Sequence, residues 1–229
     1  MIKSDSKKAI VLLSGGLDSA TALYVAKSQG YNELYALTFE YGQKHRRELE
    51  AATGIARAAG VREHRVVQLT LNQWGHSSLT DVEREIEDGA VERTDIPATY
   101  VPARNMVFLA VAASYADALE ITDIFIGVSE TDYSGYVDCR ETFIRAMEEA
   151  VNAGTMLGAE KKRRITLHTP FMHLTKAEEI RWGLQLGVDY GATWSCYRGG
   201  EKPCGSCDSC LLRAKAFKEA GISDPILSI

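Results

Sequence analysis

Short apolar runs alternate along the chain with longer segments in which apolar residues recur at helical spacing. The apolar runs predict buried strands at 9–13, 34–39, 64–69, 124–128 and 165–167. The longer segments predict helices at 18–30, 44–59, 106–119, 139–153 and 174–186. Regular alternation of strands and helices predicts an α/β fold, with a parallel sheet that has helices on both faces.

Local signals support several of these boundaries. Gly30 is the stop signal at the end of the first predicted helix, and Gly60 follows the second one; Thr175 and Glu178 have the spacing of a capping box. Residues 75–99 contain few large apolar side chains, so we expect a lid-like excursion from the core there. The pattern as a whole predicts one domain over 1–229.

Composition and charge narrow the function classes. The chain has 229 residues, of which 45% are apolar and 25% charged, and this is typical of a globular protein with one sizeable core. The net charge of −5 gives no general attraction for a polyanion, so we expect no direct binding of nucleic acid. The first residues lack the pattern of a signal peptide, and no apolar stretch is long enough to span a membrane. We therefore expect a cytoplasmic protein.

A glycine-rich loop follows the first apolar run, with the sequence Ser14-Gly15-Gly16-Leu17-Asp18-Ser19 before a predicted helix. Backbone N–H groups of such a turn and of the helix N-terminus converge on one point, which attracts an anion. Glycine lets the backbone approach a ligand, and serine hydroxyls can donate hydrogen bonds to phosphate oxygens. The spacing is neither the Walker pattern nor a dinucleotide fingerprint. The alternative is a turn that only joins strand to helix.

This loop resembles the SGGxDS signature of the N-type ATP pyrophosphatases, also called the PP-loop superfamily, whose fold is that of the adenine nucleotide alpha hydrolases. The resemblance implies that ATP is a co-substrate and that AMP and pyrophosphate are products. It also implies that Asp18 helps to place Mg²⁺. The expected ATP-binding residues are Leu13, Ser14, Gly15, Gly16, Leu17, Asp18, Ser19, Ala20 and Thr21.

Four of the five cysteines lie close together, within a segment at 194–213. Two successive C-x2-C steps join Cys204, Cys207 and Cys210, and Cys196 stands eight positions before the first of them. Four thiolates at such spacing predict a closed tetrahedral zinc site with a structural role. An iron–sulfur cluster and four unrelated buried thiols are the alternatives. Cys139 stands apart, and we interpret it as a packed residue.

Interior motifs then point to one family. The chain resembles the 7-cyano-7-deazaguanine synthases, nearly from end to end, in the segments 39–45 (FEYGQKH), 100–105 (YVPARN), 133–136 (YSGY), 169–171 (TPF), 174–176 (LTK) and the cysteine region. The resemblance implies that 7-carboxy-7-deazaguanine and ammonia are converted to the nitrile in queuosine biosynthesis, and it suggests a homodimer. One departure is Val137, at a position where we expect proline.

Residue chemistry suggests roles within that reaction. Besides Asp18 and Ser19, we expect Arg104 and Lys176 to be catalytic as cations near the phosphates, although either could be a structural or surface residue. A carboxylate suits the amino edge of a guanine-like ring, and an aromatic ring can stack on it. The predicted substrate contacts are Asp132, Tyr133, Tyr136 and Asp138.

Three other readings stay open at this point. The first is a tRNA-modifying enzyme that adenylates a base and inserts sulfur, for which Cys139 is the one cysteine outside the cluster. The second is another ammonia-using ligase, such as an NAD synthetase, although the interior motifs do not fit it. The third is a zinc-stabilised module that binds a nucleotide without catalysis.

Overall fold

A parallel sheet forms the centre of the molecule. The computed structural model describes residues 6–90, 96–129 and 136–227. Its strands run in the order β3-β2-β1-β4-β5, and every neighbouring pair is parallel. The α/β prediction is therefore confirmed. The strands are β1 (Lys8–Leu12), β2 (Glu33–Glu40), β3 (Glu63–Gln68), β4 (Asp123–Phe125) and β5 (Thr166–His168).

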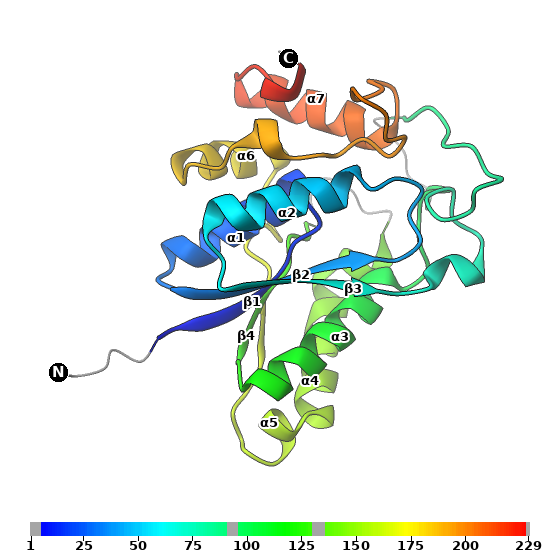
Figure 1. The fold of residues 1–229 in the computed structure, drawn as a ribbon. Coiled ribbons are helices and arrows are strands. Elements are labelled where there is room, and N and C mark those ends of the chain that lie inside the picture. The colour runs from blue at the N-terminus through cyan, green and yellow to red at the C-terminus, as the bar shows by residue number, and fades with distance from the viewer. Residues whose placement is uncertain (1–5, 91–95, 130–135, 228–229) are drawn as a thin grey trace.

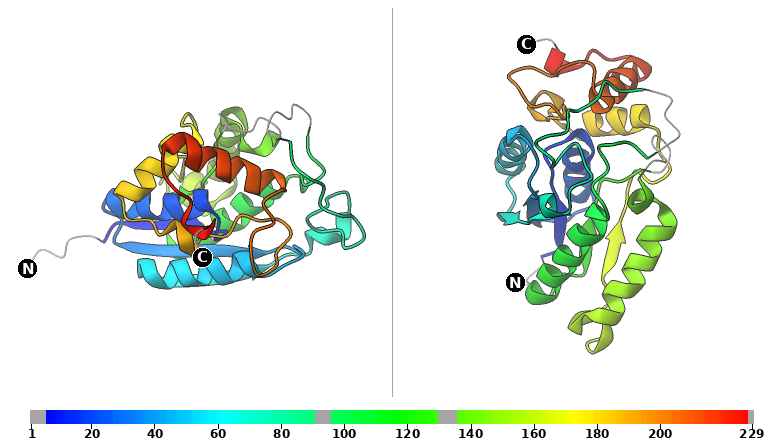
Figure 2. Two further views of the ribbon diagram at one scale, coloured as in Figure 1. Left: turned by 90° about the horizontal axis from the view of Figure 1, so that it is seen from above. Right: turned by 90° about the vertical axis from the view of Figure 1, so that its right-hand side faces the viewer.

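Helices cover both faces of this sheet, as Figures 1 and 2 show. On one face α1 and α2 lie against the strands, with α6 and α7 stacked beyond them, and on the other face lie α3, α4 and α5. The helices are α1 (Leu17–Ser28), α2 (Arg47–Ala59), α3 (Arg104–Leu119), α4 (Glu141–Gly154), α5 (Met156–Ala159), α6 (Lys176–Gln185) and α7 (Asp208–Ala220). Single 3-10 turns are η1 (Leu71–Trp74), η2 (Val137–Cys139), η3 (Tyr190–Ala192) and η4 (Pro225–Leu227).

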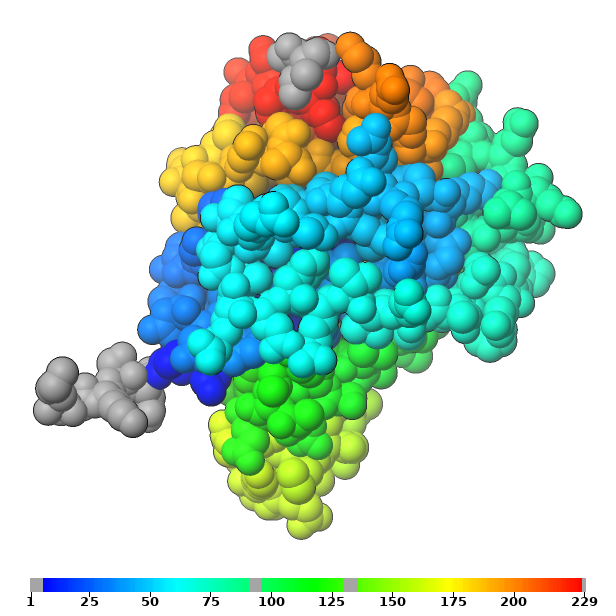
Figure 3. Space-filling view, in the orientation of Figure 1, coloured from blue at the N-terminus to red at the C-terminus, as the bar shows by residue number. Residues whose placement is uncertain are grey.

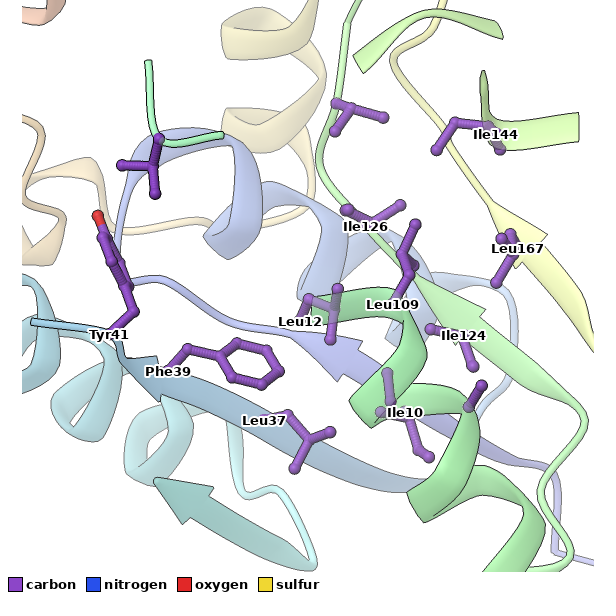
Figure 4. Close-up of a cluster of buried hydrophobic side chains, with 14 of the residues drawn as sticks. Ile10, Leu12, Leu37, Phe39, Tyr41, Leu109, Ile124, Ile126, Ile144 and Leu167 are labelled. Atoms are coloured by element: carbon purple, nitrogen blue, oxygen red, sulfur yellow. The ribbon is translucent and has the colours of Figure 1, made fainter. Parts of the chain in front are cut away.

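The alternation of side chains along β1 explains why its run of apolar residues is continuous. Ile10 and Leu12 point toward the α3 side, where they join Leu109 in one hydrophobic cluster (Figure 4). Val11 and Leu13 belong to the other cluster, on the α1 and α2 side. Successive side chains of a strand face opposite ways, so a strand that is buried on both faces has no polar positions.

Several boundaries differ from the sequence prediction. The Thr175 and Glu178 capping box is present at the start of α6, as predicted. By contrast, α2 begins three residues later than expected and α4 two residues later, because the preceding residues form turns. The helix α7, which follows the cysteines directly, was not predicted.

The excursion at 75–99 is attached to the rest of the molecule at several described points. Ser77 and Leu79 are buried, and the Gly89 N–H donates a hydrogen bond of 2.8 Å to the Ser206 carbonyl oxygen. Arg198 donates from Nε and Nη2 to the Ile86 carbonyl oxygen. Figure 3 shows the excursion in contact with the orange cysteine segment. Residues 91–95 lie outside the described residues, and the lid and the single domain stay predictions.

Within the described part of the chain, the helices are too short or too polar to cross a membrane.

Candidate active site

The site lies where the order of the strands changes direction. The chain moves outward from β1 to β2 and β3, and then returns to the other side of β1 with β4. In open α/β sheets, ligands bind beyond the carboxyl ends of the strands at such a switch point. A cavity of about 370 Å³ opens there, lined by the glycine-rich loop and by residues from α2, α3, α6 and the cysteine segment.

The loop from Leu13 to Gly16 connects β1 to α1 with a tight and specific geometry. Gly15 has a φ of +88°, and a Cβ atom there would lie 2.2 Å from the Glu48 carbonyl oxygen. Glycine is therefore required both for the backbone angle and for the close packing of α2. The hydroxyls of Ser14 and Ser19 lie 3.0 Å apart, and the Trp194 N–H donates to the Gly15 carbonyl oxygen at 2.9 Å. Ser14, Gly16, Leu17, Asp18 and Ser19 line the cavity, and ATP binding by the loop stays a prediction.

A buried charge cluster adjoins this loop. Lys176 Nζ lies 2.7 Å from Asp18 Oδ1 and 2.9 Å from Glu179 Oε2. The Glu179 side chain is 1% exposed, and its Oε1 atom has no hydrogen-bond partner among the described residues. Burial alone would lower the pKa of Lys176, but the two carboxylates raise it well above its ordinary value. The lysine is therefore held as a cation beside the loop. Burial and then the Asp18 charge raise the pKa of Glu179, and the Lys176 charge opposes this shift.

A second cationic group faces the cavity from the start of α3. Arg104 Nη1 donates to the Tyr41 hydroxyl at 3.2 Å, and the guanidinium lies 5.5 Å from the centre of that ring. Burial raises the pKa of Tyr41 to about 12. Burial also raises the pKa of Glu48 to about 7, although the Arg104 charge opposes this shift. The structure therefore brings Arg104 together with a carboxyl group from α2, and its catalytic role stays a prediction.

The predicted substrate contacts fall into different environments. Tyr136 lines the cavity, and its hydroxyl lies 3.0 Å from Thr99 Oγ1. Asp138 is buried, is not among the cavity-lining residues, and accepts a hydrogen bond of 2.8 Å from the Asn105 N–H in the first turn of α3. This helix-capping contact accounts for Asp138 without a ligand, and its substrate role stays a prediction. Asp132 and Tyr133 lie outside the described residues.

Cys139 lines the same cavity, apart from the other cysteines. Its Sγ atom accepts a hydrogen bond of 3.2 Å from Asn105 Nδ2. Burial raises the pKa of the Cys139 thiol to about 12. The thiolate is the nucleophilic form of cysteine, so this shift disfavours a nucleophilic role for Cys139.

The other four cysteines converge at the start of α7. The Sγ atoms of Cys196, Cys204, Cys207 and Cys210 all lie within 4.8 Å of one another, and those of Cys204 and Cys210 are 3.9 Å apart. Zinc–sulfur bonds of about 2.3 Å in a tetrahedron place neighbouring sulfurs about 3.8 Å apart. An iron–sulfur cluster holds its thiolates farther apart, because iron and sulfide atoms lie between them. The donor set therefore fits one metal ion with four thiolate ligands.

Comparison with known proteins identifies the family. The model of the family described as "Queuosine biosynthesis protein QueC" matches residues 8–221. The chain belongs to the QueC family. It is 56% identical over 220 residues to the 7-cyano-7-deazaguanine synthase of Clostridium kluyveri, covering 96% of this chain and 97% of the relative. It is 52% identical over 223 residues to the 7-cyano-7-deazaguanine synthase of Thermoplasma acidophilum, covering 97% and 92% of the two chains.

The fold of this QueC family member is also similar to a solved structure of lower sequence similarity. The NMN synthetase from Francisella tularensis superposes with a TM-score of 0.51 at 14% identity, covering 97% of this chain and 81% of that chain. At this level of identity the similarity concerns the fold alone. The resemblance inferred from the sequence motifs is thus confirmed at the level of the family.

Sequence reasoning about this QueC chain missed three residues at the site. Glu48 lines the cavity, Glu179 holds Lys176, and a Cβ atom on Gly127 would lie 2.7 Å from the Asp18 carbonyl carbon. A usable signal existed for the two glutamates, since each lies on the apolar face of a predicted helix where a charge is costly. Gly127 carries no such signal, because its close contact with α1 is visible only in three dimensions.

Proposed function

We propose that this QueC family member is an ATP-dependent carbon–nitrogen ligase that converts 7-carboxy-7-deazaguanine and ammonia to 7-cyano-7-deazaguanine in queuosine biosynthesis. The observation that carries this proposal is the identity of more than half of the residues, over nearly the whole chain, to proteins named 7-cyano-7-deazaguanine synthase. The glycine-rich loop and the two cationic side chains, Arg104 and Lys176, lie around one cavity, which is consistent with this proposal.

The chemistry explains why ATP is needed. A carboxylate resists attack by ammonia, because the leaving group would be an oxide. Transfer of AMP to a carboxylate oxygen creates a good leaving group, and ammonia then forms the amide. A second adenylation, at the amide oxygen, allows AMP to leave again with formation of the nitrile. Such nucleotidyl transfers depend mainly on positioning and on stabilisation of charge, so no covalent nucleophile of the protein is required.

The described residues suggest how the site divides this work. Residues 13–21 would bind the ATP phosphates through backbone N–H groups and the Ser14 and Ser19 hydroxyls. Lys176 would place its charge beside those phosphates, and Arg104 would stabilise negative charge on the carboxylate or the α-phosphate. Asp18 is 40% exposed at the loop, so its carboxylate is available to Mg²⁺, which neutralises phosphate charge when bound. Tyr136, together with Asp132, Tyr133 and Asp138, is proposed for the deazapurine ring.

The four-cysteine cluster is proposed to hold structural Zn²⁺. All four donors come from the protein, so no open position is left for water or substrate. The cluster lies between two contacts of the excursion, at Ile86 and at Gly89. Zinc would therefore fix both the start of α7 and the path of residues 86–90.

The rival reading with sulfur chemistry is disfavoured by two features. Cys139 is the cysteine available for it, and its buried thiol is held protonated. The net charge of −5 also gives no general attraction for RNA. A cytoplasmic location and a homodimer are part of the proposal, and light scattering after size exclusion would measure the latter.

The proposed reaction is tested with zinc-loaded protein, magnesium ATP, ¹⁵N-ammonium and 7-carboxy-7-deazaguanine, followed by mass spectrometry. The expected result is a nitrile that carries ¹⁵N, with two AMP molecules released for each nitrile. Release of ADP, or consumption of ATP with tRNA but not with the deazapurine, would contradict the proposal.

A further inference from the structure

The proposed reaction requires a group that removes the N–H protons of the reacting nitrogen, and the residues described so far do not include one. This argument rests on the proposed function. Nitrogen reaches the enzyme in water mostly as ammonium, with four protons, and it ends in the nitrile with none. Each proton must be taken from nitrogen close to the adenylated carbon. A base within hydrogen-bond reach of that nitrogen contributes about 10²–10⁴-fold to such steps.

The carboxylates that line the cavity can be sorted by their partners. Asp18 is paired with Lys176, and Asp208 Oδ1 accepts a hydrogen bond from the Ala90 N–H. Glu219 is exposed at the far end of α7 and pairs with Lys215 at 3.9 Å. Among residues 6–90, 96–129 and 136–227, Glu48 is the cavity carboxylate that has no hydrogen bond or ion pair.

Other candidate bases in the cavity are less suitable. The Cys139 thiol is held protonated by burial. His45 also lines the cavity, but its ring packs against Gly199 of the cysteine segment and its Nδ1 atom is buried. Burial lowers the pKa of His45 below its ordinary value, which makes it a weaker base.

The position of Glu48 suits the reacting nitrogen. It lies in the first turn of α2, the turn that packs directly against Gly15 of the glycine-rich loop. Arg104, Tyr41 and Tyr197 line the same cavity as Glu48, and the Arg104 charge lowers the pKa of the Glu48 carboxyl against the effect of burial. A carboxylate held by Arg104 and adenylated at the loop would therefore have its carbon close to Glu48.

We infer that Glu48 is a catalytic base that binds the incoming ammonium ion and removes protons from the reacting nitrogen. In the first half, the Glu48 carboxylate takes one proton from ammonium. The lone pair of ammonia forms the C–N bond, and the C–O bond to AMP breaks with its electron pair on AMP. Glu48 releases its proton to water and then takes the surplus proton of the adduct, which leaves the neutral amide, and this second proton also passes to water.

The second half follows the same pattern. The amide oxygen attacks the α-phosphorus of another ATP, the bond to pyrophosphate breaks, and one N–H proton passes to Glu48. After that proton has gone to water, the last N–H proton is removed as the C–O bond breaks, and AMP departs from the nitrile. The four protons of ammonium are thus all accounted for.

The electrostatic setting agrees with this role. Burial raises the pKa of Glu48 to about 7, and the Arg104 charge limits the rise. A general base works best when its pKa lies near the operating pH, because it can then both take up and release protons.

The test compares Glu48→Gln with the wild type and with Glu50→Gln, all as full-length zinc-loaded protein. Glu50 lies on the same helix, is exposed and pairs with Arg47, so it is a matched control. Exchange of labelled pyrophosphate into ATP, dependent on 7-carboxy-7-deazaguanine, measures adenylation without any nitrogen chemistry. We expect Glu48→Gln to keep this exchange within about threefold, and to lose about 100-fold or more in amide and nitrile formation from ammonium.

The ratio of the rates with hydroxylamine and with ammonium is a second measurement, and it does not depend on how much of the variant is folded. Hydroxylamine is largely unprotonated at neutral pH, so it needs the base less than ammonium does. The hydroxamate rate of Glu48→Gln should fall less than about tenfold, so its hydroxylamine-to-ammonium ratio rises. Equal losses with both nucleophiles, a raised KM for the deazapurine, or nitrile formation at the wild-type rate would each overturn the role of Glu48. Failure of the wild type to exchange pyrophosphate would instead refute the proposed function.

Discussion

The packing of α2 on the glycine-rich loop makes Gly15→Ala an informative change. The alanine would need the left-handed φ of +88°, and its Cβ atom would lie 2.2 Å from the Glu48 carbonyl oxygen and 2.7 Å from the Ala52 nitrogen. The left-handed conformation costs about 1–2 kcal/mol for an L-residue. Overpacking against backbone atoms adds about 1–3 kcal/mol. We therefore expect a loss of about 2–5 kcal/mol in the free energy of unfolding.

Gly60→Ala is the matched control for this change. Gly60 ends α2 with a φ of +68°, and a Cβ atom there would meet nothing within 4 Å. This variant has the conformational cost alone, about 1–2 kcal/mol. The difference between the two variants therefore isolates the steric contact between the loop and α2.

Urea unfolding of both variants measures the difference, and calorimetric titration with ATP measures its consequence. We expect Gly15→Ala to lose at least about tenfold in ATP affinity, because the loop N–H groups are displaced from their common point. Gly60→Ala should bind ATP as the wild type does. Equal stability of the two variants, or undiminished ATP binding by Gly15→Ala, would show that the contact between loop and α2 is not important.

Three further predictions concern the charge cluster, acid stability and the metal. Lys176→Met should abolish adenylation and destabilise the fold by about 3–5 kcal/mol, because Glu179 is left buried without a partner. In urea unfolding, the double variant with Glu179→Gln should recover part of the lost stability. Burial alone would raise the pKa of Asp123, but hydrogen bonds from neighbouring side chains outweigh burial and lower this pKa to about 2. In the unfolded chain the pKa of an aspartate is about 3.9. The ionised Asp123 therefore stabilises the fold by about 2–3 kcal/mol above pH 4, and this stabilisation is lost as pH falls through 2. The difference in unfolding free energy between wild type and Asp123→Asn should shrink over that range, and a constant difference would contradict this expectation. Removal of zinc, or Cys207→Ser, should speed amide hydrogen exchange at Gly89, whose N–H donates to the Ser206 carbonyl oxygen. Unchanged exchange would show that the metal site does not stabilise the excursion.

Much of the fold could be predicted because its signals are local. The run of apolar residues in β1, the loop that follows it and the Thr175 capping box each depend on neighbours in the sequence. The start of α7 was missed because the C-x2-C steps read as a turn-rich metal segment, whereas Cys207 is also the N-cap of a helix.

The candidate site was predicted only in part, for a physical reason. Lys176 and Asp18 carry motif signals, but their direct contact joins residues that are 158 positions apart. The gathering of Arg104, Tyr41 and Glu48 likewise depends on how α2 and α3 approach β2, which periodicity does not encode. Asp138 shows a contact that the motif did not indicate, since its carboxylate accepts a hydrogen bond from the Asn105 N–H at the start of α3, and its substrate role stays a prediction.

Adenylation of the substrate oxygen transfers that oxygen to AMP, and oxygen labelling can follow this transfer. 7-Carboxy-7-deazaguanine with ¹⁸O in both carboxylate positions would be turned over with magnesium ATP and ammonium, and the nucleotides and phosphates analysed by mass spectrometry. We expect both labelled oxygens to appear in AMP, one in each of two molecules, and pyrophosphate to be unlabelled. Label in pyrophosphate or inorganic phosphate, or in water alone, would contradict it.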